Sequence, residues 1–157
     1  MKSRRYKLPL IALSLSLALP AFSQSWFTPE VEKRAEDILK NMTVKECYES
    51  MEADFEGVIG RMGSEEMVKR FALKFLDDPS YSNLEKAIQE QNAEEAFRAA
   101  HTLKGLCLNL GFDRLYKVSE ELTEKLRGRE LDGYEALYGN VQKEYKNTID
   151  AIQRMKE

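Results

Sequence analysis

The sequence has little of what common catalytic and metal sites are made from. Its 157 residues include one histidine and two cysteines, and they contain neither a glycine-rich phosphate loop nor a nucleophile elbow. One histidine cannot build the usual zinc or di-iron site of a helical bundle, which takes several histidine and glutamate ligands. The two cysteines, Cys47 and Cys107, are 60 positions apart and predict neither a metal-binding pair nor a disulfide framework. We therefore expect no metal site.

Two further features of the composition limit the possible fold class and the possible binding partners. Four prolines and few neighbouring β-branched residues argue against a β-sheet. Residues 42–157 hold 17 Lys and Arg against 23 Asp and Glu, so this part of the chain is acidic and has no basic stripe. Nucleic-acid binding is therefore not expected.

The first 24 residues have the pattern of a secretory signal. An apolar run over 8–19 precedes small residues at the positions expected before a cleavage site after Ser23. The run is shorter than the roughly 20 residues that span a membrane, so membrane attachment is expected only if this leader is real and retained. Four basic residues come before the run: Lys2, Arg4, Arg5 and Lys7.

Helix start signals recur along the rest of the chain. The predicted helices begin at the Thr28-Pro29-Glu30 start signal, just after Met42, at Ser64, near Tyr81, at Asn92, at Asp113 and near Asp132. Thr43 with Glu46 has the spacing of a capping box, and Gly111 and Gly128 are expected to end two of the helices. In the helix after Ser64 the predicted core face is Met67, Val68, Phe71, Leu73 or Phe75, and Leu76.

Short connections between amphipathic helices make consecutive helices antiparallel neighbours. We therefore predict an all-α fold, an antiparallel four-helix bundle with additional short N-terminal helices. The domain organisation expected is a signal-like or spurious leader over 1–24, a helical extension over 25–41 and a helical bundle domain over 42–157.

The single histidine, His101, is predicted to point to water. On a helical wheel of about 100° per residue, four neighbours lie within roughly 60° of it: Phe97, Lys104, Gly105 and Leu108. An apolar stripe faces the other way and is expected to pack, including a buried free thiol at Cys107: Ala96, Ala99, Leu103, Leu106, Cys107 and Leu110.

This neighbourhood suits a nucleophile that carries an anionic group. A neutral imidazole is a competent nucleophile near pH 7, and the Lys104 ammonium can neutralise a dianion attached to the ring. Gly105 lacks a side chain and would let another protein approach, while Phe97 and Leu108 offer apolar contact area. The competing interpretation is an ordinary surface histidine, with Gly105 present for close helix packing.

Residues 97–111 contain His-x-x-Lys-Gly followed by a second glycine, Gly111. This pattern resembles the signature of histidine-containing phosphotransfer (HPt) domains, and the resemblance extends over about residues 43–155. It implies that His101 is the phosphorylated residue, Lys104 the phosphate-stabilising lysine and Gly105 the small residue beside the ring. It also offers two candidates for a polar phosphate contact on the following helix: Ser119 and Thr123.

What the resemblance implies is a carrier and not an ATP-dependent kinase. The Nε2 atom of His101 would exchange a phosphoryl group with the aspartate of receiver domains, in response regulators or hybrid histidine kinases. The chain would bind no cofactor of its own, because the receiver supplies Mg²⁺. Phe97, Arg98 and Leu108 would form the docking surface, and the chain is expected to be a monomer.

The leader conflicts with this interpretation, since a phosphorelay operates in the cytoplasm and a signal sequence exports. Met42, directly before the Thr43–Glu46 capping box, is an alternative start that would leave the domain cytoplasmic. Two other classes stay open from sequence. One is an exported helical interaction protein with no phosphotransfer role, and the other is a degenerate phosphotransfer fold that binds partners without accepting phosphate.

Overall fold

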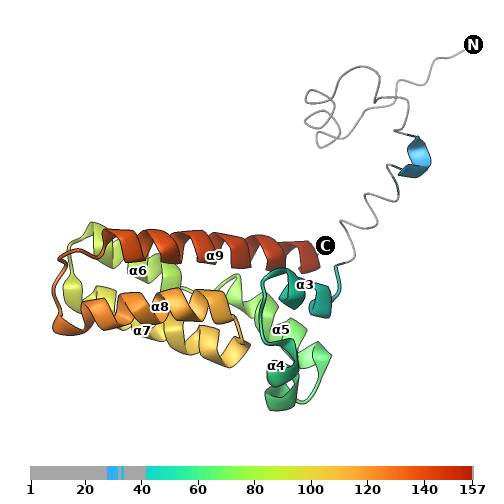
Figure 1. The fold of residues 1–157 in the computed structure, drawn as a ribbon, viewed down its shortest axis with the longest axis horizontal. Helices are drawn as coiled ribbons and strands as arrows, with labels where there is room; N and C mark the ends of the chain where they lie inside the picture. The colour runs from blue at the N-terminus through green and yellow to red at the C-terminus, as the bar shows by residue number, and fades with distance from the viewer. Residues whose placement is uncertain (1–27, 32, 34–41, 157) are drawn as a thin grey trace, which may run out of the picture. The chain divides into compact units, whose positions relative to one another are not determined.

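The computed structural model describes residues 28–31, 33 and 42–156, which contain helices and no strand (Figure 1). The leader expected over 1–24 and most of the extension expected over 25–41 lie outside these residues. At Thr28 the predicted helix start is present, since the Val31 amide donates to Thr28 Oγ1 at 3.3 Å. This turn belongs to one unit of the chain, and residues 42–156 belong to a second, compact unit.

The second unit consists of seven α-helices and one 3₁₀ turn within its described residues. Three short helices come first, and four helices form the bundle; η2 follows α8. Their bounds are α3 Val44–Ser50, α4 Phe55–Met62, α5 Glu65–Phe75, α6 Ser80–Gln89, α7 Ala93–Leu110, α8 Asp113–Lys125, η2 Leu126–Gly128 and α9 Glu135–Lys156. The predicted all-α bundle with additional short N-terminal helices is confirmed.

Small side chains let the bundle helices approach closely. Helix α7 packs between α6 and α8, and α8 packs against α9 (Figure 1). On α7, Ala96 and Ala100 are fully buried, and Ala99 is nearly so. Alanine favours helix and leaves room for a neighbouring backbone. Helix α7, which carries His101, is therefore held firmly between its neighbours.

Aromatic side chains join the short helices to the end of the bundle. The Tyr48 ring of α3 lies 5.6 Å from the rings of both Phe55 and Phe112, and the Phe75 ring of α5 meets Phe112 edge-on at 5.3 Å. Such tilted and edge-on pairs are the preferred arrangement of aromatic rings. Phe112, between α7 and α8, is therefore the point where the two regions meet.

Most predicted helix ends are confirmed by their hydrogen bonds. Thr43 and Glu46 form the reciprocal capping box, and the Asn92 side chain accepts from the Glu95 amide at 3.1 Å. Gly111 ends α7 in the left-handed conformation, with φ of 67°. A Cβ atom at Gly111 would collide with Val58 of α4, so a glycine is required there for both reasons.

Two predictions from local pattern were wrong. Asp113 is not a cap: Phe112 occupies the N-cap position of α8 with no side-chain cap bond, because its buried ring fixes where the helix begins. Phe71 is not in the core but 39% exposed, since Val68, Ala72 and Phe75 form the buried face of α5.

The other helix ends differ from prediction by a few residues. The helix that begins at Asp113 ends at Lys125, and its predicted end at Gly128 is the end of the 3₁₀ turn. The last helix begins at Glu135 instead of near Asp132, after Gly133 with φ of 64°. None of the helices described is long and apolar enough to span a membrane.

Candidate functional site: the exposed face of helix α7

Helix α7 presents His101 to solvent, as its helical position predicts. The stripe on the far side is buried, with Ala96, Ala99, Leu103, Cys107 and Leu110 all in the core and Leu106 partly so. His101 is exposed. Hydrophobic burial of one face thus fixes the orientation of the other. The imidazole is available to a partner without any movement of the helix.

Lys104 and Gly105 lie one helical turn beyond the histidine, and both are half-buried. A Cβ atom at Gly105 would meet no atom within 4 Å. Internal helix packing therefore does not require the glycine, which removes that explanation for its presence. Leu108, two turns on, is 57% exposed and extends the open face.

Phe97 is less accessible than the sequence suggests. It is half-buried, and the guanidinium carbon of Arg129 lies 3.5 Å from its ring centroid. The Phe97 and His101 rings meet at 5.9 Å with an interplanar angle of 78°. The exposure predicted for Phe97 was wrong because residues after α8 fold back over α7, which no local pattern in α7 reveals.

Arg98 is exposed on the flank of α7. Its guanidinium bonds to Glu94 at 3.1 Å and to Glu95 at 3.2 Å, both pairs within one turn of the helix. Arg98 and Thr102 line a groove of about 390 Å³ between α6 and α7. The structure thus leaves Arg98 and Leu108 on the surface around His101, in the positions expected of them.

The two candidate phosphate contacts on α8, Ser119 and Thr123, are both fully buried. The Thr123 hydroxyl donates to the Ser119 carbonyl at 2.6 Å, and Ser119 Oγ has no hydrogen-bond partner among the described residues. The structure therefore does not bring either hydroxyl to the solvent face of His101.

Glu124 is the acidic neighbour that sequence reasoning missed. Hydrogen bonds from Arg127, at 2.6 and 2.7 Å, hold the pKa of Glu124 below its usual value, and the Lys104 ammonium acts in the same direction. The carboxylate of Glu124 is therefore close enough to the Lys104 ammonium for the two charges to interact. The position of Glu124 relative to α7 depends on the register of α8 against α7, and no local sequence pattern predicts that register.

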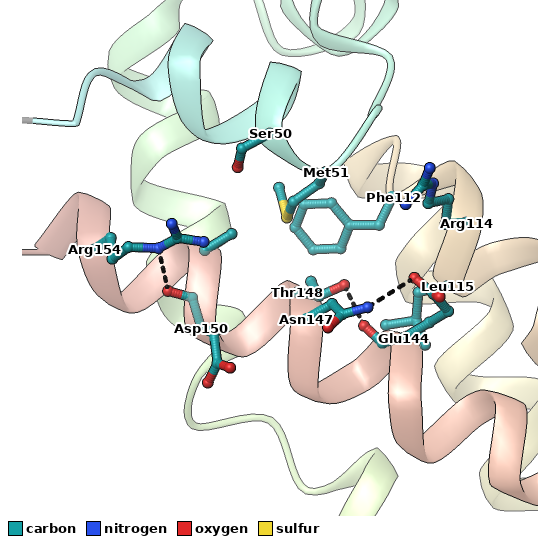
Figure 2. Close-up of a pocket in the computed structure, with 11 residues that line it drawn as sticks. Ser50, Met51, Phe112, Arg114, Leu115, Glu144, Asn147, Thr148, Asp150 and Arg154 are labelled. Carbon is teal, nitrogen blue, oxygen red and sulfur yellow. Dashed lines mark hydrogen bonds between the residues drawn. The ribbon is translucent and has the colours of Figure 1, made fainter. Parts of the chain in front are cut away.

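The recess in Figure 2 lies elsewhere, between α3, the start of α8 and α9, and has a volume of about 180 Å³. None of the predicted site residues lines it. Its polar groups are largely engaged already: Asn147 donates to Glu144, Arg154 donates to the Asp150 carbonyl, and Arg114 pairs with Glu52. The recess therefore offers few free groups for chemistry.

Neither cysteine nor metal chemistry has support in the described residues. They contain no group of three or more His, Cys, Asp or Glu side chains that could hold a metal ion. Cys47 and Cys107 are free and buried, as predicted for Cys107. Burial raises the pKa of Cys47 to about 11, and it also raises the pKa of Cys107. Both thiols are therefore inert at neutral pH.

Comparison with known proteins places the site in a family. The family model described as the Hpt domain matches residues 79–155, which include α6, α7, α8 and nearly all of α9. Helices α3–α5 lie before the match. No curated protein and no solved structure matches the chain. The bundle that presents His101 is the matched region, and the chain therefore carries an Hpt domain at residues 79–155.

Proposed function

We propose that the protein is a phosphohistidine carrier of a phosphorelay, with His101 as the residue that is phosphorylated. One observation carries the proposal. The single histidine of the chain is exposed on α7 of an Hpt domain, one turn before a lysine and a glycine beside which a Cβ atom would meet no neighbouring segment. Membership of the Hpt family supports a role in phosphoryl transfer in general, and we propose the roles of the individual residues.

The reaction is a reversible exchange between nitrogen and oxygen. The neutral Nε2 atom of His101 attacks the phosphorus of an aspartyl phosphate on a receiver domain. The N–P bond forms as the O–P bond breaks, and the receiver keeps a free aspartate carboxylate. In this reaction in-line positioning and charge neutralisation supply most of the rate, and the receiver contributes Mg²⁺. The chain itself need bind no cofactor.

Lys104 and Gly105 have separate roles in this scheme. The Lys104 ammonium offsets the charge of the phosphoryl group once it is on the imidazole. Gly105 leaves room for the receiver backbone beside the ring. Leu108 and Arg98 lie on the same exposed surface and would contact the receiver, while Ser119 and Thr123 stay buried and are not needed. A transient partner of this kind suits a monomer.

The proposed partners are receiver domains of response regulators or hybrid histidine kinases, and they place the protein in the cytoplasm. The basic-apolar leader over 1–24 favours a second candidate, an exported helical interaction protein. Mass spectrometry of the natural N-terminus separates them. A protein that begins at Met42 supports the carrier, and one that begins at Gln24 in an extracellular fraction supports export.

The direct test is phosphoryl transfer from receiver domains charged with ³²P acetyl phosphate in the presence of Mg²⁺. The wild-type chain should become labelled, and the label should be acid-labile and alkali-stable, as a phosphoramidate is. His101→Gln should abolish labelling with an unchanged helical circular-dichroism spectrum. Asn109→Ala, an exposed change on the same helix, is the control and should be labelled normally.

Two results would contradict the proposal. Labelling that persists in His101→Gln would place the phosphate elsewhere. If the wild-type chain folds but no receiver labels it, two alternatives remain: an exported interaction protein and a degenerate fold that binds partners without accepting phosphate. Incubation with ³²P ATP alone should label nothing, because a carrier is not an ATP-dependent kinase.

A further inference from the structure

The turn that follows α8 returns to the site and covers a side chain next to His101. Arg129, directly after η2, places its guanidinium carbon 3.5 Å from the centroid of the Phe97 ring. Phe97 lies on α7 one turn before His101. The contact therefore joins the loop between α8 and α9 to the helix that presents the histidine.

Arg129 is held from several directions. Its Nε atom donates to Glu94 at 2.6 Å, and one terminal nitrogen donates to the Arg127 carbonyl at 2.7 Å. Glu94 also accepts from Arg98. The hydrogen bond from Arg129 is the main cause of a lowered pKa at Glu94, so this carboxylate stays charged and keeps its hold at neutral pH.

The backbone places Arg129 at the end of η2 in the left-handed conformation. Arg129 has φ of 60°, in the left-handed region that a non-glycine residue seldom adopts. That conformation is kept although a glycine precedes it at Gly128. The Arg129 amide caps η2 by donating to the Leu126 carbonyl at 2.9 Å, and the side-chain contacts of Arg129 act together with this bond to hold the residue in place.

The Phe97 ring in turn meets the imidazole. The two centroids are 5.9 Å apart and the rings are nearly perpendicular, which is a favoured geometry for aromatic pairs. With one side of Phe97 covered by a guanidinium, the ring has little freedom to turn away. His101 is exposed, and Phe97 is the aromatic ring that meets its imidazole among the described residues.

We propose that Arg129 is a positioning residue for phosphoryl transfer, which acts on His101 through Phe97. The inference rests on the proposed function of His101. Arg129 holds Phe97, and Phe97 keeps the imidazole in an orientation from which Nε2 attacks in line. Arg129 is not proposed as a phosphate ligand, because its Nε and one terminal nitrogen already donate to Glu94 and to the Arg127 carbonyl.

The test compares variants that separate charge, ring and backbone. Arg129→Gly removes the guanidinium and keeps a residue that accepts φ of 60° without strain. Arg129→Lys keeps the charge but loses the planar group that stacks on the ring. Phe97→Leu removes the ring and keeps an apolar side chain. Arg114→Ala is the matched control, since it removes an exposed arginine that pairs with Glu52 and has no cation–π contact with a ring among the described residues.

The first readout is proton NMR of the imidazole in the free protein. The chain has one histidine, so its ring resonances belong to His101 without further assignment. Phe97→Leu should shift them by removing the ring current of the phenyl group. Arg129→Gly and Arg129→Lys should shift them in the same direction, and Arg114→Ala should leave them unmoved. Resonances of Arg129→Gly at the wild-type position would overturn the proposal.

The second readout is the rate of labelling by a charged receiver, measured over a range of receiver concentrations. Misplacement of a reacting group costs rate within the complex, so Arg129→Gly should lower the saturating rate by about tenfold. The half-saturating concentration should change by less than about twofold. A change confined to the half-saturating concentration would make Arg129 a docking residue and overturn the proposal.

The two readouts keep the inference separate from the proposed function. If no receiver labels the wild-type chain, the proposed function fails, and the NMR comparison still decides whether Arg129 orients the imidazole. If the wild-type chain is labelled and Arg129→Gly equals Arg114→Ala in both readouts, the proposed function stands and the positioning role falls.

Discussion

The four bundle helices α6–α9 and the three short helices α3–α5 are packed in different ways. The fully buried core of the bundle is mostly alanine, leucine and other aliphatic side chains, with Ala96 and Ala100 fully buried on α7. One stacked pair of rings, Tyr81 and Tyr145, joins α6 to α9 at the partly buried edge of this core. The short helices are joined to the bundle through rings, chiefly Tyr48, Phe55 and Phe112. Small residues give close, parallel helix surfaces, whereas large rings fill the irregular space where helices cross.

The difference explains what each region does for the site. The bundle supplies a helix of 18 residues, α7, long enough to expose His101 well away from either end. The short helices close the far end of that helix: the Asp54 amide donates to the Gly111 carbonyl at 3.0 Å. The region that matches the Hpt family presents the histidine, and the region outside the match covers one end of the core.

The largest expected effect comes from breaking the junction between the two regions. Phe112→Ala removes a ring that is 2% exposed and touches both Tyr48 and Phe75. It should lower the free energy of unfolding by about 3–5 kcal/mol in urea denaturation, because a large cavity remains. The matched control is Phe71→Ala, on the exposed side of α5, which should cost less than about 1 kcal/mol. Equal losses would mean that the aromatic junction contributes nothing special.

A second change tests the bundle alone. Ala96→Leu adds bulk at a fully buried position on α7 and should destabilise the protein by about 1–3 kcal/mol through overpacking. Ala136→Leu, at an exposed position on α9, is the control and should stay within about 0.5 kcal/mol of wild type. Urea denaturation measures both. If Ala96→Leu is as stable as the wild type, the core around α7 is not closely packed at this position.

A third change should separate stability from function. Gly105→Ala places a Cβ atom where no other atom lies within 4 Å, so it should raise the stability of α7 by about 1 kcal/mol. The same methyl group should slow phosphoryl transfer, because a docked receiver would meet it. Gly139→Ala on α9, also without a close neighbour, should stabilise similarly and leave transfer unchanged. Transfer at the wild-type rate in Gly105→Ala would contradict the access role.

The smallest expected effect is at a buried hydroxyl of the aromatic cluster. Tyr48 Oη has no hydrogen-bond partner among the described residues, so Tyr48→Phe removes an unsatisfied polar atom. Thermal unfolding should show unchanged stability or a gain of up to about 1 kcal/mol. Tyr116→Phe is the opposite case, because the Tyr116 hydroxyl donates to Glu120 at 2.7 Å. A clear loss in Tyr48→Phe would reveal a partner such as an ordered water.

Local signals predicted the helices well because caps and periodicity act over four or five residues. The capping box of Thr43 and Glu46, the cap at Asn92 and the left-handed Gly111 were all read from neighbouring residues. The orientation of His101 followed in the same way. A stripe of apolar residues on one side of a helix determines which side faces water.

Contacts between distant segments were not predictable in this way. Arg129 covers Phe97 from 32 positions along the chain, and the register of α8 against α7 lets the charge of Glu124 interact with that of Lys104. Burial of Ser119 and Thr123 depends on the same register. Phe71 lies outside the core because packing against the other helices buries the face of α5 formed by Val68, Ala72 and Phe75.

The sequence by itself determined that residues 42–156 are mostly helical, where most of these helices begin, and that His101, Lys104 and Gly105 share the face of α7 that is turned away from the core. Each of these depends on residues within one or two turns of a helix. Only the tertiary structure decided that Arg129 covers Phe97 and that Ser119 and Thr123 are buried. It also decided that packing between the helices does not require a glycine at position 105. These properties depend on which surfaces meet when helices pack, and packing joins residues that are far apart in the chain.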